Sequence, residues 1–444
     1  MIATNRPTNV RHRIIAVSML MAFILYLDRI CMGEIVKSAS FNHDLNLSKE
    51  QIGQILGSFF FAYALFQVPA GWASDRFGAR AMLTIYITLW SIFTMLTGFM
   101  NGFLGLLIAR LLCGISEAGA YPTSAAVIRK WAPVDGRARA SGMVALGGRI
   151  GGTLAPFLTI WMILKLGSWR TSLWVDGVAG LVIALIYWKF VRSSPEEHPQ
   201  VNAAELKLIG SPGPEKKLSG RELKSALWSF TRSGSLWCNA ANQMLSNVGW
   251  VFLVTWLPTY LVQERGVGEM EGGRMVTYVL AFGMLGQVVG GYYCDWTTRR
   301  FGLRWGRVIP MSSSMFLCAA AYLCCPYVSS TWLLIGCCAV VSFGTDMANP
   351  ATWAFMTDVG GRGTAAAMGW GNMWGNFGAS ASAMAVPWLL VRGGGDGRTL
   401  VFFTLAGAFL LAGLVVLPMN ATKKLLPDEP ASLPPSPALE GVVR

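Results

Sequence analysis

Long apolar runs alternate with short polar segments along almost the whole chain. Many of these runs hold about 20 residues, enough for an α-helix to cross the ~30 Å hydrocarbon layer of a membrane. A helix is expected because it pairs its own backbone groups, which lipid cannot do. The ~10-residue alternating segments of a membrane barrel do not occur. The pattern predicts twelve membrane helices, at about residues 14–36, 51–73, 81–100, 103–125, 139–161, 170–191, 233–262, 272–296, 308–328, 331–353, 365–391 and 398–420.

Composition and charge agree with this pattern. The 444-residue chain is 53% hydrophobic and 13% charged, whereas soluble proteins carry about 25% charged residues. Most Lys and Arg fall in segments on the same side of the membrane as the N-terminus, so the positive-inside rule predicts that both termini are cytoplasmic. This asymmetry accounts for the net charge of +13 without nucleic-acid binding. We expect an all-α integral protein of the lipid bilayer, and the short tails favour a bacterial inner membrane.

The polar segments divide the spans into two sets of six. The longest, residues 192–232, is charged and punctuated by Pro and Gly, which predicts a cytoplasmic linker. The six-helix halves are then residues 1–191 and 233–420. They echo each other: GWASDRFGAR follows the second span and GGYYCDWTTRRFGLR the eighth, with Asp75 and Asp295 at matching places. Internal repeats of this kind are typical of secondary transporters. Residues 421–444, rich in Pro, Ser and Ala, predict a disordered cytoplasmic tail.

The sequence offers no metal centre and no catalytic motif. The nine cysteines lack metal-ligand spacing and are expected to act as small apolar residues. No HExxH, GxSxG or phosphate-binding loop occurs. We therefore expect a monomer that is not an enzyme and has no cofactor and no bound metal.

Charged residues that lie deep inside the predicted spans include Asp28, Arg29, Arg110, Glu117 and Arg149. Each unpaired charge near the bilayer centre costs about 2.5–3.5 kcal/mol, so these groups must face each other, the bundle interior or water. Arg110 and Glu117 are seven residues apart and share one face of a helix. One interpretation is ion pairs that only hold helices together. Apolar packing would do this without the cost, which favours a polar site.

The residue types predict an anion site coupled to protons. The planar guanidinium of a buried arginine matches the two oxygens of a carboxylate. Burial favours the neutral, protonated form of a carboxyl group. Protonation of Asp28 and Glu117 would make this group of five more positive and favour anion binding. The alternative is a proton antiporter that exports a drug-like or other small molecule, which the excess of buried arginine fits poorly.

The loop GWASDRFGAR, with its second copy, resembles the signature of the major facilitator superfamily. The stretches YLDR at 26–29, AYALFQVPAGWASDRFG, ARLLCGISEAGAYP and TWLPTYLVQERG resemble its anion:cation symporter branch, which carries organic anions such as sugar acids. The resemblance covers residues 10–420. It implies a twelve-helix major facilitator fold and proton-coupled uptake of a small organic anion by alternating access.

The resemblance also implies residue roles. Asp28 and Glu117 match the proton-coupling carboxylates of the branch, Arg29 its substrate-binding arginine, and Arg110 an arginine that bridges carboxylates and substrate. The signature loops imply a gate that ties the halves together on the cytoplasmic side. Its residues are Gly71, Asp75, Arg76, Gly78, Arg80 and Asp295.

The second half offers neutral polar groups in its spans. Such groups often hold membrane helices together. The resemblance instead favours binding of substrate hydroxyls by Gln243, Trp353 and either Asn372 or Asn376. Tyr26 and Tyr63 would lie opposite them.

Arg149 departs from the pattern of the branch. It is predicted about 15 Å deep in the fifth span. One interpretation is an ion pair with Asp28, Glu117, Asp176 or Asp346. Another is a second anion contact, suited to a dianion or a phosphorylated substrate. A third is a position facing a water-filled crevice.

Overall fold

The computed structural model describes residues 6–210, 220–392 and 397–426, and their regular secondary structure is helical throughout. The first half contains α1 (Val10–Ile35), α3 (Lys49–Phe77), α4 (Ala79–Thr97), α5 (Phe103–Glu117), α6 (Ala120–Trp131), α7 (Arg137–Leu166) and α8 (Trp169–Phe190). The second contains α11 (Gly234–Val251), α12 (Leu257–Arg265), α13 (Glu269–Cys324), α14 (Thr331–Val359), α15 (Thr364–Arg392) and α16 (Gly397–Val415). Three short helices lie outside the bundle: α2 (Ala39–Leu45), α9 (Ala203–Ile209) and α10 (Gly220–Arg232).

These helices supply twelve membrane spans. Nine stretches of the described residues are long and apolar enough to cross a membrane. One of them, Met270–Tyr327, holds two spans, because Gly302 turns the chain with φ 77° and ψ 175°. The helices α15 and α16 complete the set. The predicted all-helical membrane fold is confirmed. Side chains such as Phe61, Leu164 and Leu185 are 68%, 78% and 70% exposed, as expected for a surface that faces lipid.

Two predicted spans are interrupted. The fourth breaks into α5 and α6 directly after Glu117. Pro122 cannot donate a backbone hydrogen bond, and its ring crowds the carbonyl of Ala118 four residues earlier. The seventh contains a π-helical segment, Phe252–Trp256, between α11 and α12, just before Pro258. Such segments locally widen a helix and are frequent at functional sites.

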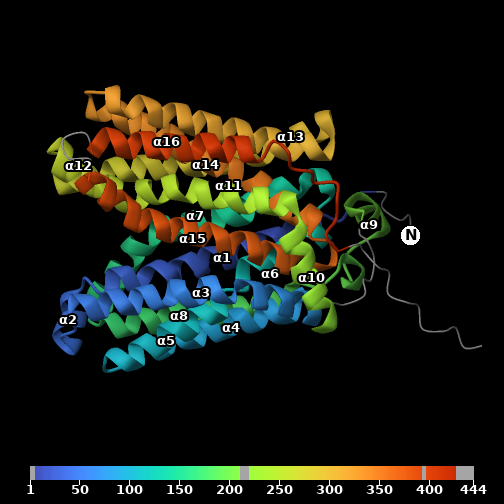
Figure 1. Ribbon diagram of the computed structural model, residues 1–444. Coiled ribbons are helices and arrows are strands. Elements are labelled where there is room, and N and C mark those ends of the chain that lie inside the picture. The colour runs from blue at the N-terminus through green and yellow to red at the C-terminus, as the bar shows by residue number, and fades with distance from the viewer. Residues whose placement is uncertain (1–5, 211–219, 393–396, 427–444) are drawn as a thin grey trace, which may run out of the picture.

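The two halves lie side by side in Figure 1, with α2 and α12 at one end and α9 and α10 at the other. The helix α3 packs against α15, and α7 packs against α13 and α14. The helix α6 packs against α14 and α15 as well, so the interface between the halves is built by spans two, four and five of one half and spans eight, ten and eleven of the other.

Parts of the predicted linker and tail belong to the described residues. Residues 192–232 carry α9 and α10. At the other end, the Leu425 amide donates to the Val359 carbonyl at 2.7 Å, and the Arg362 amide donates to the Leu426 carbonyl at 3.3 Å. The first residues of the predicted tail thus contact the loop between α14 and α15. Residues 427–444 of the predicted tail lie outside the described part of the chain.

Candidate functional site: a charged and amide-lined cavity between the halves

Arg29 and Glu117 form a buried ion pair. Arg29 Nε donates to Glu117 Oε1 at 2.8 Å, and Arg29 Nη2 bonds the same oxygen. The side chains are only 12% and 3% exposed. The aromatic rings of Tyr26, Phe59 and Tyr63 surround the guanidinium, and the Tyr63 ring centroid is nearest, at 4.4 Å. The resemblance predicts that Arg29 binds substrate and that Glu117 carries a proton. The two side chains are here bound to each other.

Asp28 occupies a separate environment although it precedes Arg29 directly, because adjacent helical residues point in different directions. It is 2% exposed, and both carboxyl oxygens lack a hydrogen-bond partner among the described residues. Arg110, Glu117 and Asp176 lie within electrostatic reach of it, and the Trp90 indole lies beside it. Arg110 itself lies over the Phe59 ring, 4.5 Å from its centroid.

Arg149 pairs with Asp346 and so joins α7 of one half to α14 of the other. This is one of the partners that the sequence left open; Asp28, Glu117 and Asp176 are not bonded to it. The Arg149 guanidinium also lies over the Trp250 ring, 4.7 Å from the centroid. The ion pair and the ring together place a cation at the centre of the interface.

Two cavities meet at this ion pair, and Tyr26, Arg149, Trp250 and Asp346 line both. The outer cavity, of about 120 Å³, extends towards the end that carries α2 and α12, and its further lining residues are Ile30, Gly148, Gly152, Thr153, Val254, Leu280 and Met284. The inner cavity, of about 140 Å³, extends the other way, and its further lining residues are Asn242, Gln243, Ser246, Asn247, Met315, Thr345, Ala348, Asn349, Thr352, Trp353 and Asn372. The outer cavity is mostly apolar, and the inner one is rich in amides and hydroxyls.

Three of the four residues predicted in the second half line the inner cavity, and the fourth does not. Gln243, Trp353 and Asn372 line it. Asn372 Nδ2 donates to Gln67 Oε1 at 2.7 Å and approaches Tyr63 Oη at 3.5 Å. Asn376 does not line the cavity and donates to the Asn372 carbonyl at 2.8 Å. Of the two asparagines, Asn372 is therefore the one that faces this cavity.

Sequence reasoning missed two residues here. Gln67, fully buried on α3, carries the contact to Asn372 across the halves. Trp250, on α11, flanks Arg149. An uncharged amide inside an apolar span was the available signal for Gln67, whereas nothing in the local pattern distinguishes Trp250 from a lipid-facing tryptophan.

The repeated loops make matching contacts between the halves. Asp75 accepts hydrogen bonds from the Ala365 and Ala366 amides at 3.0 and 2.9 Å, at the N-terminus of α15. The partial positive charge of a helix N-terminus favours a carboxylate there. A Cβ at Gly71 would lie 2.4 Å from the Ala365 carbonyl oxygen, so glycine is required for this approach. Asp295 accepts from Arg139 Nε at 2.7 Å, in the first turn of α7.

The other predicted gate residues contact their own half. Arg76 lies over the rings of Trp72 and Phe77. Arg80 donates to the Trp188 carbonyl on α8, with Nη2 at 2.7 Å. Gly78 has a φ of 99° and joins α3 to α4. These three shape the loop, while Gly71 and Asp75 make the contact across the interface.

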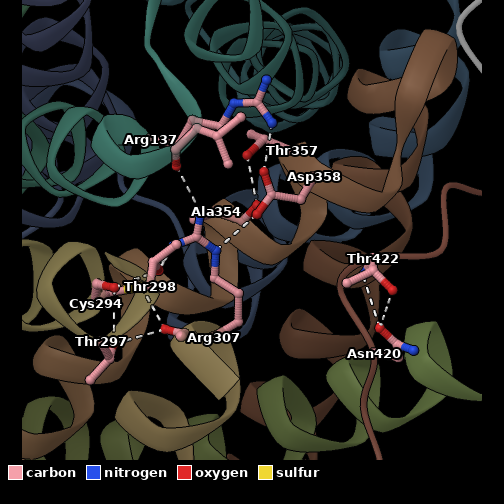
Figure 2. A network of polar contacts seen from close by, with 12 residues as sticks. Arg137, Cys294, Thr297, Thr298, Arg307, Ala354, Thr357, Asp358, Asn420 and Thr422 are labelled. Atoms are coloured by element: carbon pink, nitrogen blue, oxygen red, sulfur yellow. Dashed lines mark hydrogen bonds and ion pairs between the residues drawn. The ribbon is translucent and has the colours of Figure 1, made fainter. Parts of the chain in front are cut away.

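A further polar network at the same end was not predicted (Figure 2). Asp358 accepts from Arg137 Nη1 at 2.6 Å and from Arg307 Nε at 2.8 Å, so it links α7 to α13 and α14. Arg307 is fully buried and also donates to the Val134 carbonyl at 3.0 Å. Charges near predicted loops look solvated in a sequence, which is why this cluster gave no signal.

Known proteins share this architecture. The solved structure of the proton:xylose symporter XylE bound to 6-bromo-6-deoxy-D-glucose matches with a TM-score of 0.70 and 17% identity over 95% of this chain and 98% of its own. The human organic anion transporter MFSD10 matches with a TM-score of 0.67 and 16% identity, over 91% and 99% of the two chains. At this level of identity the likeness concerns the fold alone.

Curated relatives are more similar in sequence. A probable sulfoacetate transporter, SauU of Cupriavidus necator, is 29% identical over 95% of this chain and 96% of its own length. The hexuronate transporter of Bacillus subtilis is 30% identical over 88% of each. The probable galactarate/D-glucarate transporter GudP of Escherichia coli is 26% identical over 94% and 95%. The model of the Major Facilitator Superfamily matches residues 18–383, and the chain therefore belongs to this superfamily of membrane transporters, which are not enzymes.

Proposed function

We propose that the protein takes up a small organic anion, a sugar acid or a related carboxylate, together with protons. The observation that carries this is the Arg29–Glu117 pair, buried between aromatic rings beside a cavity lined with amides. Relatives named for sulfoacetate, hexuronate and galactarate/D-glucarate transport support an acidic substrate. The buried arginines fit such a substrate better than a cationic drug.

The pair suggests how proton and anion are coupled. As long as Glu117 is ionised, it occupies Arg29. A proton on Glu117 removes that charge, and the substrate carboxylate takes its place on the guanidinium fork. Asp28 provides a second proton site, since a carboxyl group that is this deeply buried and forms no ion pair among the described residues is tolerated best as the neutral acid. Arg110 lies close to Asp28 and balances its charge whenever it ionises.

The second half would recognise the rest of the substrate. Gln243 and Asn372 line the inner cavity with both donors and acceptors, which suits hydroxyl groups. Tyr26 and Tyr63 face them from the first half, and Trp353 supplies an apolar wall that meets the Tyr121 ring edge-on at 4.8 Å. Both cavities lie within one chain, so a monomer is sufficient for transport.

Alternating access would use the contacts of Asp75, Asp295 and Asp358. All three join the halves at the end that carries α9 and α10, which we assign to the cytoplasm of a cell with an inner membrane. Their release, with closure of the outer cavity, would open the inner cavity to the cytoplasm.

The test is transport by the purified protein in proteoliposomes with imposed gradients. We expect uptake of sugar acids to rise with an inward proton gradient and to collapse with an uncoupler. Accumulation that follows a sodium gradient and ignores the proton gradient would contradict the proton coupling. Export of a cationic drug against protons, without carriage of any organic acid, would favour the antiporter. A protein that only senses the anion, without transporting it, would bind the anion and show no counterflow in proteoliposomes.

A further inference from the structure

The Arg149–Asp346 ion pair is unevenly buried. The Arg149 side chain is 21% exposed and the Asp346 side chain only 3%. Both residues line the two cavities, and the arginine offers them more accessible surface than the carboxylate does. An anion in either cavity can therefore reach the Arg149 side chain.

Arg149 also keeps unused hydrogen-bonding capacity. A guanidinium carries five N–H donors. Within the described part of the chain, the Arg149 side chain makes one hydrogen bond, from Nη2 to Asp346 Oδ1. Arg29, by comparison, directs both Nε and Nη2 to Glu117 and is 12% exposed. A purely structural ion pair is expected to use more of its donors and to be shielded from the cavity.

The two arginines share a neighbour, Tyr26. The Tyr26 ring centroid is 5.0 Å from the Arg29 guanidinium carbon, and Tyr26 also lines both cavities with Arg149. A Cβ at Gly148, the residue before Arg149, would lie 2.5 Å from Tyr121 Oη and 2.8 Å from Tyr26 Cδ2. Tyr26 thus contacts the Arg29 guanidinium and also packs against the backbone next to Arg149. The two arginines share an aromatic neighbour.

We propose that Arg149 is a second anion-binding group, so that the transporter selects small anions with two acidic groups, one bound by Arg29 and the other by Arg149. The inference deepens the proposed function and rests on it. Asp346 acts as the resident counter-ion, which keeps Arg149 compensated when no substrate is bound. A substrate with one acidic group leaves the Arg149–Asp346 pair unchanged.

The arrangement explains why both arginines carry an acid in this structure. A buried cation without a counter-charge is costly. Glu117 and Asp346 therefore fill the two positions that the acidic groups of the substrate would take. The two sites differ in one respect, because Glu117 lies in the same half as Arg29 whereas Asp346 reaches Arg149 from the opposite half. Replacing Asp346 by substrate loosens a bond between the halves.

The experiment compares matched substrates in proteoliposomes. Galactarate and D-galactonate share a carbon skeleton and differ in one carboxylate, and sulfoacetate and acetate form a second, shorter pair. We expect the wild-type protein to prefer the dianion of at least one pair, by kcat/KM. Arg149→Gln should lower kcat/KM for that dianion about 10- to 100-fold, the effect of losing a charged hydrogen-bonded contact. The loss for its single-charged counterpart should be smaller, so that the ratio of the two kcat/KM values falls about 10-fold.

Two further variants keep the test decisive. The double variant Arg149→Gln/Asp346→Asn removes both charges and leaves a neutral amide pair, so it guards against misfolding caused by an unpaired Asp346. It should reproduce the selective loss. Asp346→Asn alone should tighten dianion binding, measured by tryptophan fluorescence of the purified protein, because Arg149 then has no competing carboxylate.

The outcomes separate this inference from the proposed function. Equal losses for both members of a pair, or a wild type that carries only the single-charged members, would overturn the second subsite and leave organic-anion transport intact. A wild-type protein that carries no organic acid of either kind would overturn both.

Discussion

The two halves share one fold and differ in the chemistry that they present to the interface. The first half buries Asp28, Arg29, Arg110 and Glu117 within its own helices, where they compensate one another. The second half lines the inner cavity chiefly with neutral amides and hydroxyls, and Asp346 is its one acid there. The difference suggests a division of labour, in which charge and protons are handled by the first half and the shape of the substrate by the second.

The gate contacts of the halves differ in a parallel way. Asp75 of the first half binds two backbone amides at the N-terminus of α15. Asp295 of the second half binds the Arg139 side chain, which is 41% exposed. A contact to backbone amides is fixed by the position of a helix, whereas a contact to a long exposed side chain tolerates movement. The two copies of the loop thus lie at matching places, but the contact made by Asp75 is more rigid than the contact made by Asp295.

Substitution of the acids of the first half should have the largest effect on transport. Asp28→Asn and Glu117→Gln should each abolish gradient-driven accumulation in proteoliposomes, because a neutral amide cannot carry a proton. Glu117→Gln should still bind substrate, since the amide resembles the protonated acid and leaves Arg29 unoccupied. Gln243→Ala in the second half is the matched control: it should raise KM several-fold, as the loss of a neutral hydrogen bond of about 1 kcal/mol does, and keep the coupling.

Two results would contradict this difference between the halves. If the double variant of Asp28 and Glu117 still accumulated substrate on a proton gradient, proton coupling would not reside in the first half. If Gln243→Ala also uncoupled transport, the division of labour between the halves would be wrong.

A moderate effect is expected at the gate. Asp75→Asn should slow transport about 10-fold while substrate binding stays within twofold, because one amide of α15 then faces the side-chain NH₂ and loses roughly 1–1.5 kcal/mol of interaction. Asp295→Asn should slow transport less, about two- to threefold, because the exposed Arg139 contributes little. Transport and binding of both variants can be measured on the same preparations. Equal effects of the two substitutions would remove the difference in stiffness inferred here.

The membrane fold was predictable because its signals are long and repeated. Each span carries an apolar run, and the loops with Asp75 and Asp295 mark the same place in both halves. The interruptions were not predicted, since each depends on a single proline, Pro122 or Pro258, whose effect on a membrane helix varies with its neighbours. The break after Glu117 places the acid at the end of α5.

The sequence indicated which residues belong to the candidate site. It did not indicate which of them form ion pairs with each other. Spacing put Arg110 and Glu117 on one helix face, yet Glu117 takes Arg29 of α1 as its partner. Helical periodicity shows which residues share a face of one helix. It does not show how two helices are rotated relative to each other. The same limit left the partner of Arg149 open among four acids, and only the packing of α7 against α14 selects Asp346.

The smallest effect concerns the contact between α9 and the first half. The buried Glu205 carboxylate accepts hydrogen bonds from the amides of Val10 and Arg11 at 3.1 and 3.0 Å, at the N-terminus of α1. Burial alone would raise the pKa of Glu205. The hydrogen bonds from Thr8, Arg11 and Val10 outweigh it and hold the pKa below its ordinary value of 4.5. The ionised form is thus the one that the folded protein favours.

Glu205→Gln should therefore lower thermal stability slightly, by about 1 kcal/mol, as loss of a helix N-cap does. A group with a lowered pKa contributes its stability above its unfolded value and loses it as the pH falls through the folded value. The difference in Tm between wild type and Glu205→Gln should thus be full near pH 7 and shrink below about pH 4. Glu197→Gln, at an exposed position of the same segment, is the control and should leave Tm unchanged. A difference between wild type and Glu205→Gln that persists undiminished at low pH would show that shape, and not the carboxylate charge, holds α9 to α1.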